Sequence, residues 1–259
     1  MSKVNALFRK RIGILEKEVI SFEKLDEVLE KTAFMIPFEN LCIVENRIKG
    51  LTTENVMEKV LVQREGGLCY ELNTILYLFL KENGFDVTMV RGVVYNQMKK
   101  DWSETGRTHV ANLIQDNGKF YLVDTGFGGN LPLKPVPLTG EVVTSNNGEF
   151  RIERNESEHG DFILYMKLKH KGPEWKIGYA FDSKDFVKKI EDLNEIQTVI
   201  AEHPESAFNK KPLVTKLTED GSVTLTAGSF TQWADGQEKK EEMDEGKFKE
   251  FKKTYFGLE

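Results

Sequence analysis

The sequence has 259 residues, 39% of them hydrophobic, and a formal net charge of −6. This length can bury a substantial core and suggests about two domains of ordinary size. The acidic net charge argues against an extended surface for binding nucleic acid. The sequence has no run of about 18 apolar residues, the length that a membrane-spanning helix needs. Because charged and apolar residues interleave throughout residues 1–30, we expect a globular, cytoplasmic protein without a signal peptide.

Cysteine and histidine are scarce in this sequence. The two cysteines, Cys42 and Cys69, are too few for a disulfide framework or for a zinc site with paired cysteines, so both thiols should be free. The four histidines are scattered along the chain, and we expect no metal site.

The first part of the chain has the periodicity of helices. Apolar residues recur at helical intervals over residues 5–34. Pro37 should end this pattern, because it has no backbone donor and restricts the residue before it, so residues 36–41 are expected to be irregular. A further helix is predicted over residues 53–61, with Thr52 or Thr53 as its N-cap.

A longer helix is predicted after the pair Gly66-Gly67. Its apolar face consists of Leu72, Ile75, Leu76, Phe79 and Leu80. Gly84 should end this helix. Cys69 therefore falls in the first turn.

From Phe85 onward the periodicity is that of strands. Runs rich in β-forming residues lie at 87–95, 109–115, 119–124, 138–143, 150–153, 162–169 and 176–181. They predict an antiparallel barrel or curled sheet. A connecting helix is predicted over 186–202, then strands near 213–217, 222–227 and 229–233, and finally a charged helix over about 238–255.

Cys69 carries the sharpest chemical signal. A thiol in the first turn of a helix lies near the positive end of the helix dipole, which favours the thiolate. A free cysteine can also be a small core residue, and Cys42, flanked by Leu41 and Ile43, fits that description.

A cysteine nucleophile needs an imidazole to take its proton and an acid to orient that imidazole. The dipeptide Asn117-Gly118 is a strong signal for a two-residue hairpin, which would pair Asp116 with Lys119. Continuing that register places His109 and Asp124 on one face as diagonal neighbours within side-chain reach. The alternative is a half-buried sheet histidine with an unrelated turn aspartate, and a one-residue bulge would break the register.

A glycine cluster follows the proposed acid directly, at Gly126, Gly128 and Gly129. Missing side chains would let a phosphorylated or thioester ligand approach backbone donors, with Phe127 as an apolar wall. The segment lacks the Lys-Ser/Thr of a P-loop and opens no helix, so it indicates neither an ATPase nor a dinucleotide fold. An ordinary loop is the alternative.

Separated stretches of this chain resemble the arylamine N-acetyltransferase family. They are residues 37–41, 64–73, 108–113 with 121–128, and 203–208. The second stretch resembles the nucleophile motif of the family, with one departure: members commonly carry arginine four residues before the cysteine, where this sequence has Glu65. The similarity covers most of the chain.

The resemblance implies an α+β fold in three parts: a helical bundle over residues 1–84, an antiparallel β-barrel over 85–185 and an α/β lid over 186–259. It also implies a triad of Cys69, His109 and Asp124. In the implied ping-pong reaction, acetyl-CoA acylates the cysteine, and a small aromatic amine or hydrazine then takes the acetyl group.

The same resemblance suggests which residues contact the substrates. Thr108, Gly126, Phe127 and Gly128 are the candidates for CoA contacts. Phe38 and Phe127 would be the flat apolar walls that an aromatic acceptor needs, with core packing as the alternative for both. Backbone donors near the thiol would stabilise the oxyanion.

Other functions remain open from the sequence. Papain-like and transglutaminase-like hydrolases also place a cysteine at a helix start and the histidine and acid on later strands. The local papain signature is absent around Cys69, which argues against a protease. A non-catalytic binding protein on the same fold is a further alternative, although an intact triad argues against it.

Overall fold

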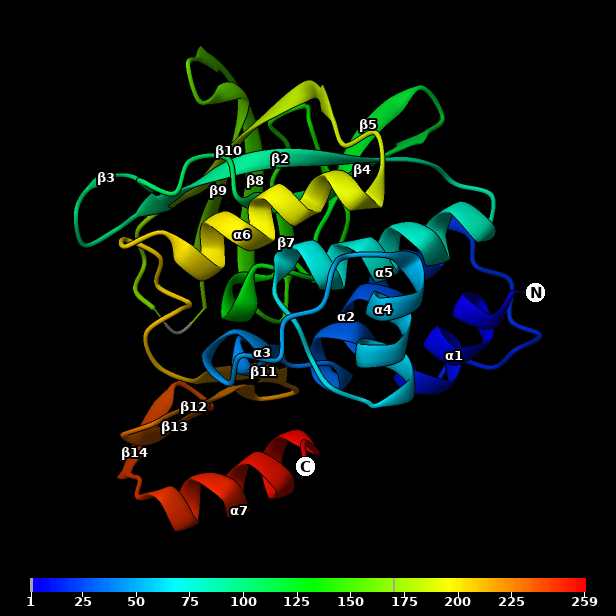
Figure 1. Cartoon of the computed structure of the whole chain (residues 1–259). Helices are drawn as coiled ribbons and strands as arrows, with labels where there is room; N and C mark the ends of the chain where they lie inside the picture. Colours follow the sequence, from blue (N-terminus) through cyan, green and yellow to red (C-terminus); the bar gives the residue numbers. More distant parts are fainter. Residues whose placement is uncertain (1, 170) are drawn as a thin grey trace.

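The computed structural model describes residues 2–169 and 171–259 (Figure 1). Helices come first, then the strands of a curled sheet, and finally a smaller sheet with a helix against it. This α+β arrangement confirms the predicted fold class. The division into domains at residues 84 and 185 stays a prediction. Within the described residues, no helix is both long enough and apolar enough to cross a bilayer.

The helical elements of the first part are α1 (Lys3–Ile12), η1 (Phe22–Lys24), α2 (Leu25–Met35), α3 (Leu41–Val44), α4 (Thr53–Met57), the π-helical turn η2 (Glu58–Val62) and α5 (Cys69–Glu82). Helix α2 ends at Met35, because Pro37 cannot donate a hydrogen bond and Ile36 before it is extended. Helix α4 begins where the Thr52 hydroxyl accepts the N–H of Asn55 at 3.2 Å, which confirms the predicted N-cap.

The segment after α2, predicted to be irregular, has no regular structure at Pro37 and Asn40 but contains a short strand that was not predicted. Phe38–Glu39 form β1, which pairs with β11 (Leu213–Thr218). The N–H of Glu39 also donates to the carbonyl oxygen of Gly67 at 3.0 Å. Both partners are distant in the sequence, and two residues are too few to show a strand periodicity.

The central elements are β2 (Asp86–Asn96), β3 (Asp101–Trp102), β4 (His109–Asp116), β5 (Lys119–Val123), η3 (Gly128–Asn130), β6 (Val136–Pro137), β7 (Val143–Ser145), β8 (Gly148–Ser157), β9 (Gly160–Leu168) and β10 (Lys176–Phe186). The sheet has the order β6-β5-β4-β2-β10-β9-β8-β7, with β3 paired to β2, and it curls into a nearly closed antiparallel barrel (Figure 1). The strand expected over 138–143 is wrong, because the chain turns at Gly140 with a φ of +85°.

The hairpin of β4 and β5 has the predicted register. Asn117 and Gly118 both have positive φ, as a type I′ turn requires. Asp116 pairs with Lys119, and the ladder continues without a bulge. His109 is the first residue of β4, and Asp124 directly follows β5.

The last part holds η4 (Ile190–Leu193), α6 (Asn194–Glu202), β11, β12 (Gly221–Thr226), β13 (Ser229–Ala234), β14 (Gln237–Glu242) and α7 (Glu245–Phe256). Helix α6 begins later than predicted, because Phe186 still belongs to β10. The predicted C-terminal helix also began too early. Its first residues form β14, which pairs with β13 across a turn at Asp235 and Gly236, and α7 starts only after its N-cap Asp244.

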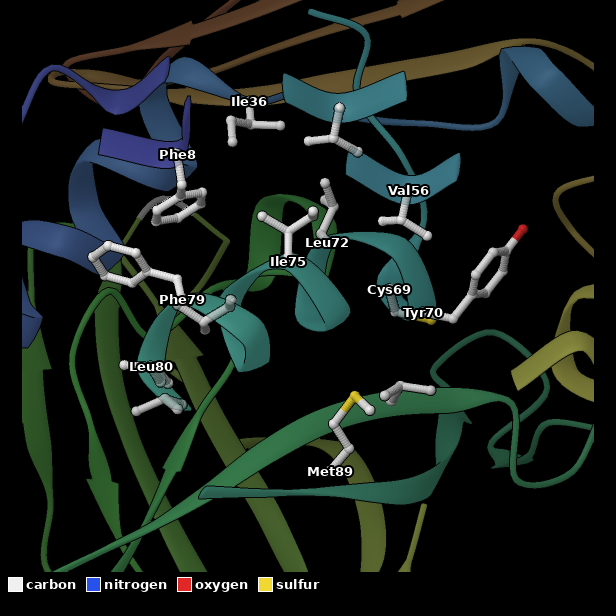
Figure 2. Packing of buried hydrophobic residues seen from close by; sticks show 14 of the residues in the cluster. Phe8, Ile36, Val56, Cys69, Tyr70, Leu72, Ile75, Phe79, Leu80 and Met89 are labelled. Carbon is white, nitrogen blue, oxygen red and sulfur yellow. The ribbon is translucent and has the colours of Figure 1, made fainter. Parts of the chain in front are cut away.

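Helix α5 is buried between the helical part and the barrel (Figure 2). Its predicted apolar face is buried. The ring of Phe79 lies 4.6 Å from that of Phe8 on α1, and the Thr74 hydroxyl lies 3.8 Å from the Met89 sulfur on β2. Packing on both sides therefore fixes the axis of α5 and, with it, the position of Cys69 at its start.

Removing the Phe79 ring tests this packing. Because the side chain is fully buried, Phe79→Ala should lower the free energy of unfolding by about 3–5 kcal/mol. Urea unfolding followed by circular dichroism measures the loss. The control is Phe120→Ala on β5, where the ring is 50% exposed and the expected change is within about 0.5 kcal/mol. An equal loss in both variants would contradict the assignment of α5 to the core.

Candidate active site

Cys69 is the first residue of α5 and is buried. The N–H of Leu68, the N-cap residue, donates to Oε2 of Glu71 at 2.9 Å. The Glu71 side chain, in the first turn of α5, therefore stabilises the start of this helix. The thiol donates to the carbonyl oxygen of Thr108 at 3.4 Å. The sulfur therefore lies near the positive end of the dipole of α5.

His109 and Asp124 are in direct contact. Nε2 of the imidazole lies 2.8 Å from Oδ2 of the carboxylate, and both side chains are buried. Since Nε2 is engaged, Nδ1 is the nitrogen that can exchange a proton with Cys69. Burial lowers the pKa of His109, but the Asp124 charge, with a smaller contribution from Cys69, more than offsets this and raises that pKa to about 10.

The Asp124 carboxylate is surrounded by hydrogen-bond donors. Oδ2 also accepts from the Tyr179 hydroxyl at 2.8 Å, while Oδ1 accepts from Nδ2 of Asn73 at 2.8 Å and from the N–H of Gly126 at 2.7 Å. Burial raises the pKa of Asp124, but His109, Asn73 and the N–H of Gly126 outweigh it and hold that pKa below its usual value. The carboxylate is therefore ionised where it orients the imidazole.

Sequence reasoning missed Asn73 and Tyr179. Asn73 lies four residues after Cys69 on the same helix, so its face could have been read from the spacing. Tyr179 gave no local signal, because the pairing of β10 with β2, next to β4, is what brings it to this point. Its ring centroid lies 4.3 Å from that of His109 and 5.0 Å from that of Phe127.

A cleft of about 390 Å³ opens beside Cys69. The residues named from the sequence as possible substrate contacts all line it: Phe38, Thr108, Gly126, Phe127 and Gly128. Phe208 is a further aromatic wall that the sequence had not indicated, and its ring stands edge-on to Phe38 at 5.6 Å. Aliphatic side chains complete the apolar lining at Val94, Ile200 and Leu213.

Two glycines of the loop after Asp124 are required by geometry. A Cβ on Gly126 would lie 2.5 Å from Cα of Cys69, so the loop packs directly against the helix start. Gly128 has a φ of +60°, a conformation that side-chain-bearing residues seldom adopt. The glycine cluster thus lets the loop approach both the thiol and the cleft.

In the described part of the chain, no group of three or more histidine, cysteine, aspartate or glutamate side chains is placed to hold a metal ion. The polar groups that line the cleft include the thiol of Cys69, the imidazole of His109 and the side chains of Ser103, Thr105 and Thr108.

The site can be compared with known proteins. A family model described as N-acetyltransferase matches residues 21–259. A probable arylamine N-acetyltransferase of Dictyostelium discoideum is 35% identical, over 93% of this chain and 87% of its own. The chain belongs to the arylamine N-acetyltransferase family. It is therefore an acetyltransferase.

Solved structures of related acetyltransferases have the same fold. An arylamine N-acetyltransferase of Bacillus cereus is 40% identical with a TM-score of 0.94, covering 100% of this chain and 99% of its own. One of Bacillus anthracis is 39% identical with a TM-score of 0.95, covering 100% of both chains. The Bacillus cereus enzyme is described as having a unique Cys-His-Glu catalytic triad, whereas in this acetyltransferase the carboxylate beside His109 is Asp124.

The two thiols should differ in reactivity towards iodoacetamide. Burial raises the pKa of Cys42 to about 11, so this thiol is almost fully protonated at neutral pH. Cys69 lines the cleft beside His109, whose pKa of about 10 keeps a positive charge next to the sulfur at neutral pH. We expect Cys69 to be alkylated at least about tenfold faster at pH 7, as measured by peptide mapping after brief labelling. Faster labelling of Cys42, or equally slow labelling of both, would contradict this.

Proposed function

We propose that this acetyltransferase moves the acetyl group of acetyl-CoA to small aromatic amines or hydrazines through a thioester on Cys69. The catalytic triad is Cys69, His109 and Asp124. The observation that carries the proposal is the buried 2.8 Å contact between His109 and Asp124, next to a thiol at a helix start in an aromatic cleft. The Dictyostelium and Bacillus relatives, whose names give an arylamine as acceptor, support this substrate class.

In the first half-reaction, the Cys69 thiolate attacks the carbonyl carbon of acetyl-CoA. Backbone N–H groups in the first turn of α5 stabilise the tetrahedral oxyanion. When the bond to the CoA sulfur breaks, the imidazolium of His109 supplies the proton that CoA leaves with. Asp124 holds the imidazole with Nδ1 towards the reacting sulfur throughout.

In the second half-reaction, the amine nitrogen attacks the thioester carbonyl carbon. The bond to Sγ of Cys69 breaks, and the neutral imidazole of His109 takes the proton that the nitrogen loses. The products are the acetylated amine and the starting thiolate–imidazolium pair. Because the imidazole is uncharged before this step and charged after it, the ionised Asp124 stabilises the state that forms.

The cleft suits a flat acceptor. Phe38, Phe127 and Phe208 supply aromatic walls, and offset or edge-on contacts with an arylamine ring favour that acceptor over an aliphatic amine. Thr108 and the loop residues Gly126 and Gly128 lie at the same cleft and are the proposed contacts of the acetyl donor. The buried site also keeps water from the thioester, which separates transfer from hydrolysis.

Acetyl-enzyme should accumulate when no amine is present. Intact-protein mass spectrometry after mixing with acetyl-CoA should show one added acetyl group, which addition of an arylamine removes while the acetylated amine appears. The adduct should be absent in Cys69→Ala. If the adduct forms but the amine neither discharges it nor becomes acetylated, the proposed acceptor class is wrong. Peptide cleavage without an adduct would favour a hydrolase instead.

Changing Asp124 to Asn should lower the turnover of acetyl transfer by about two orders of magnitude or more, because the amide neither holds the same tautomer nor stabilises the imidazolium. Steady-state release of CoA measures it, with circular dichroism to check the fold. Asp116→Asn at the far end of the same hairpin is the control and should keep normal turnover. Near-normal turnover of Asp124→Asn would reject the triad.

A further inference from the structure

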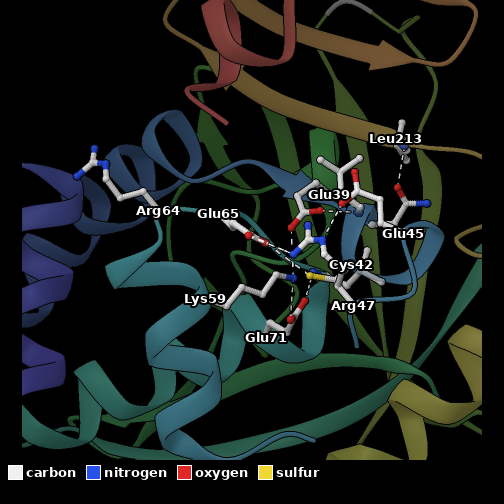
Figure 3. A network of polar contacts seen from close by, with 12 residues as sticks. Glu39, Cys42, Glu45, Arg47, Lys59, Arg64, Glu65, Glu71 and Leu213 are labelled. Carbon is white, nitrogen blue, oxygen red and sulfur yellow. Dashed lines mark hydrogen bonds and ion pairs between the residues drawn. The ribbon is translucent and has the colours of Figure 1, made fainter. Parts of the chain in front are cut away.

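The start of α5 carries a second set of buried charges, away from the cleft (Figure 3). The position four residues before Cys69, where the family motif has arginine, holds Glu65. Its carboxylate lies 3.2 Å from the guanidinium of Arg47 and accepts from the Cys42 thiol at 3.5 Å. Position 65 therefore brings no positive charge to this place, and the nearby buried cation comes from Lys59 on η2.

Lys59 lies between two carboxylates. Its ammonium donates to Oε1 of Glu71 at 2.8 Å and lies 3.2 Å from Oε1 of Glu39. The side chains are 13%, 8% and 1% exposed, respectively. Burial lowers the pKa of Lys59, but the two carboxylates outweigh it and hold that pKa well above its ordinary value. The lysine is a fixed positive charge.

The first carboxylate connects Lys59 to the nucleophile. Glu71 uses its other oxygen, Oε2, to accept the N–H of Leu68 at 2.9 Å, and Leu68 is the residue directly before Cys69. The position of the Glu71 carboxylate therefore determines the position of the backbone at Leu68 and Cys69, including the N–H groups next to the thiol.

The second carboxylate connects Lys59 to the acceptor wall. Oε2 of Glu39 accepts the N–H of Leu41 at 2.6 Å, which holds the carboxylate at the start of α3. Glu39 follows Phe38, whose ring lines the cleft, and together they form β1. Fixing Glu39 therefore fixes the position of that ring.

Without the ammonium, Glu39 and Glu71 would face each other with no positive charge between them. A buried charge that loses its partner is strongly unfavourable, so the two segments would move apart or take up solvent. The consequence is local, at the helix start and at β1, where displacements on the scale of an ångström matter for reaction geometry.

We propose that Lys59 is a positioning residue for acetyl transfer, because its ammonium joins the start of the nucleophile helix to the aromatic acceptor wall through Glu71 and Glu39. This assignment rests on the proposed function, and it gives the two carboxylates separate tasks. Glu71 acts on the thiol, and Glu39 acts on the acceptor.

The first test compares Lys59→Met, Lys59→Arg and the surface control Lys134→Met, which removes a lysine paired with Asp26. Steady-state kinetics with an arylamine should give Lys59→Met an acceptor KM raised about tenfold and a kcat lowered about tenfold, with alkylation of Cys69 slowed to a similar degree. Lys59→Arg keeps the charge and should stay within about threefold of the wild type, as should the control.

Glu39→Gln separates the effect on the acceptor from the effect on the thiol. It also tests the proposal if Lys59→Met does not fold. It should raise the acceptor KM several-fold while alkylation of Cys69 stays within about twofold. A folded Lys59→Met with unchanged alkylation and acceptor KM overturns the proposal, as does a Glu39→Gln variant with unchanged acceptor KM. Alkylation of Cys69 does not require acetyl transfer. Slower alkylation in Lys59→Met alone therefore supports the role of Lys59 and Glu71 at the start of α5, even if the wild type acetylates no arylamine.

Discussion

A carboxylate that leaves water needs donors for its oxygens, and Asp124 finds them on elements far apart in the sequence. Asn73 comes from α5, His109 from β4, Tyr179 from β10 and the N–H of Gly126 from the adjoining loop. Each donor offsets part of the cost of burying the charge. The hydrogen bonds can form together only if the helix, the hairpin and the barrel are correctly docked, so the fold and the site depend on the same contacts.

The same contacts set the place of the thiol. Asn73 lies one turn after Cys69 on the same face of α5. The hydrogen bond from Asn73 therefore holds the Asp124 carboxylate beside the first turn of this helix. Gly126 closes the arrangement from the other side, since its Cα packs against Cys69 with no room for a side chain. Within this frame the imidazole of His109 has one position left, between the carboxylate and the sulfur. The buried carboxylate of Asp124 then favours the charged form of that imidazole.

Local signals predicted the parts of the site that depend on local geometry. The Asn117-Gly118 turn and the alternation of a hairpin were enough to place His109 near Asp124, because register follows from the turn type. Tyr179 and the strand β1 were missed, since their partners are distant in the sequence and leave no periodicity. Lys59 was missed for a related reason: Glu65 was visible as a departure from the motif, but which cation meets the buried carboxylates depends on tertiary packing.

The identity of the acid is tied to the loop that follows it. Oδ1 of Asp124 accepts from the N–H of Gly126, two residues further on, so the carboxylate is folded back over its own backbone. A glutamate here would carry its carboxylate about 1.5 Å further out, past the donors that Asn73 and Gly126 provide. The choice between aspartate and glutamate is thus a property of the whole set of contacts, and exchanging one residue alone would leave buried donors unpaired.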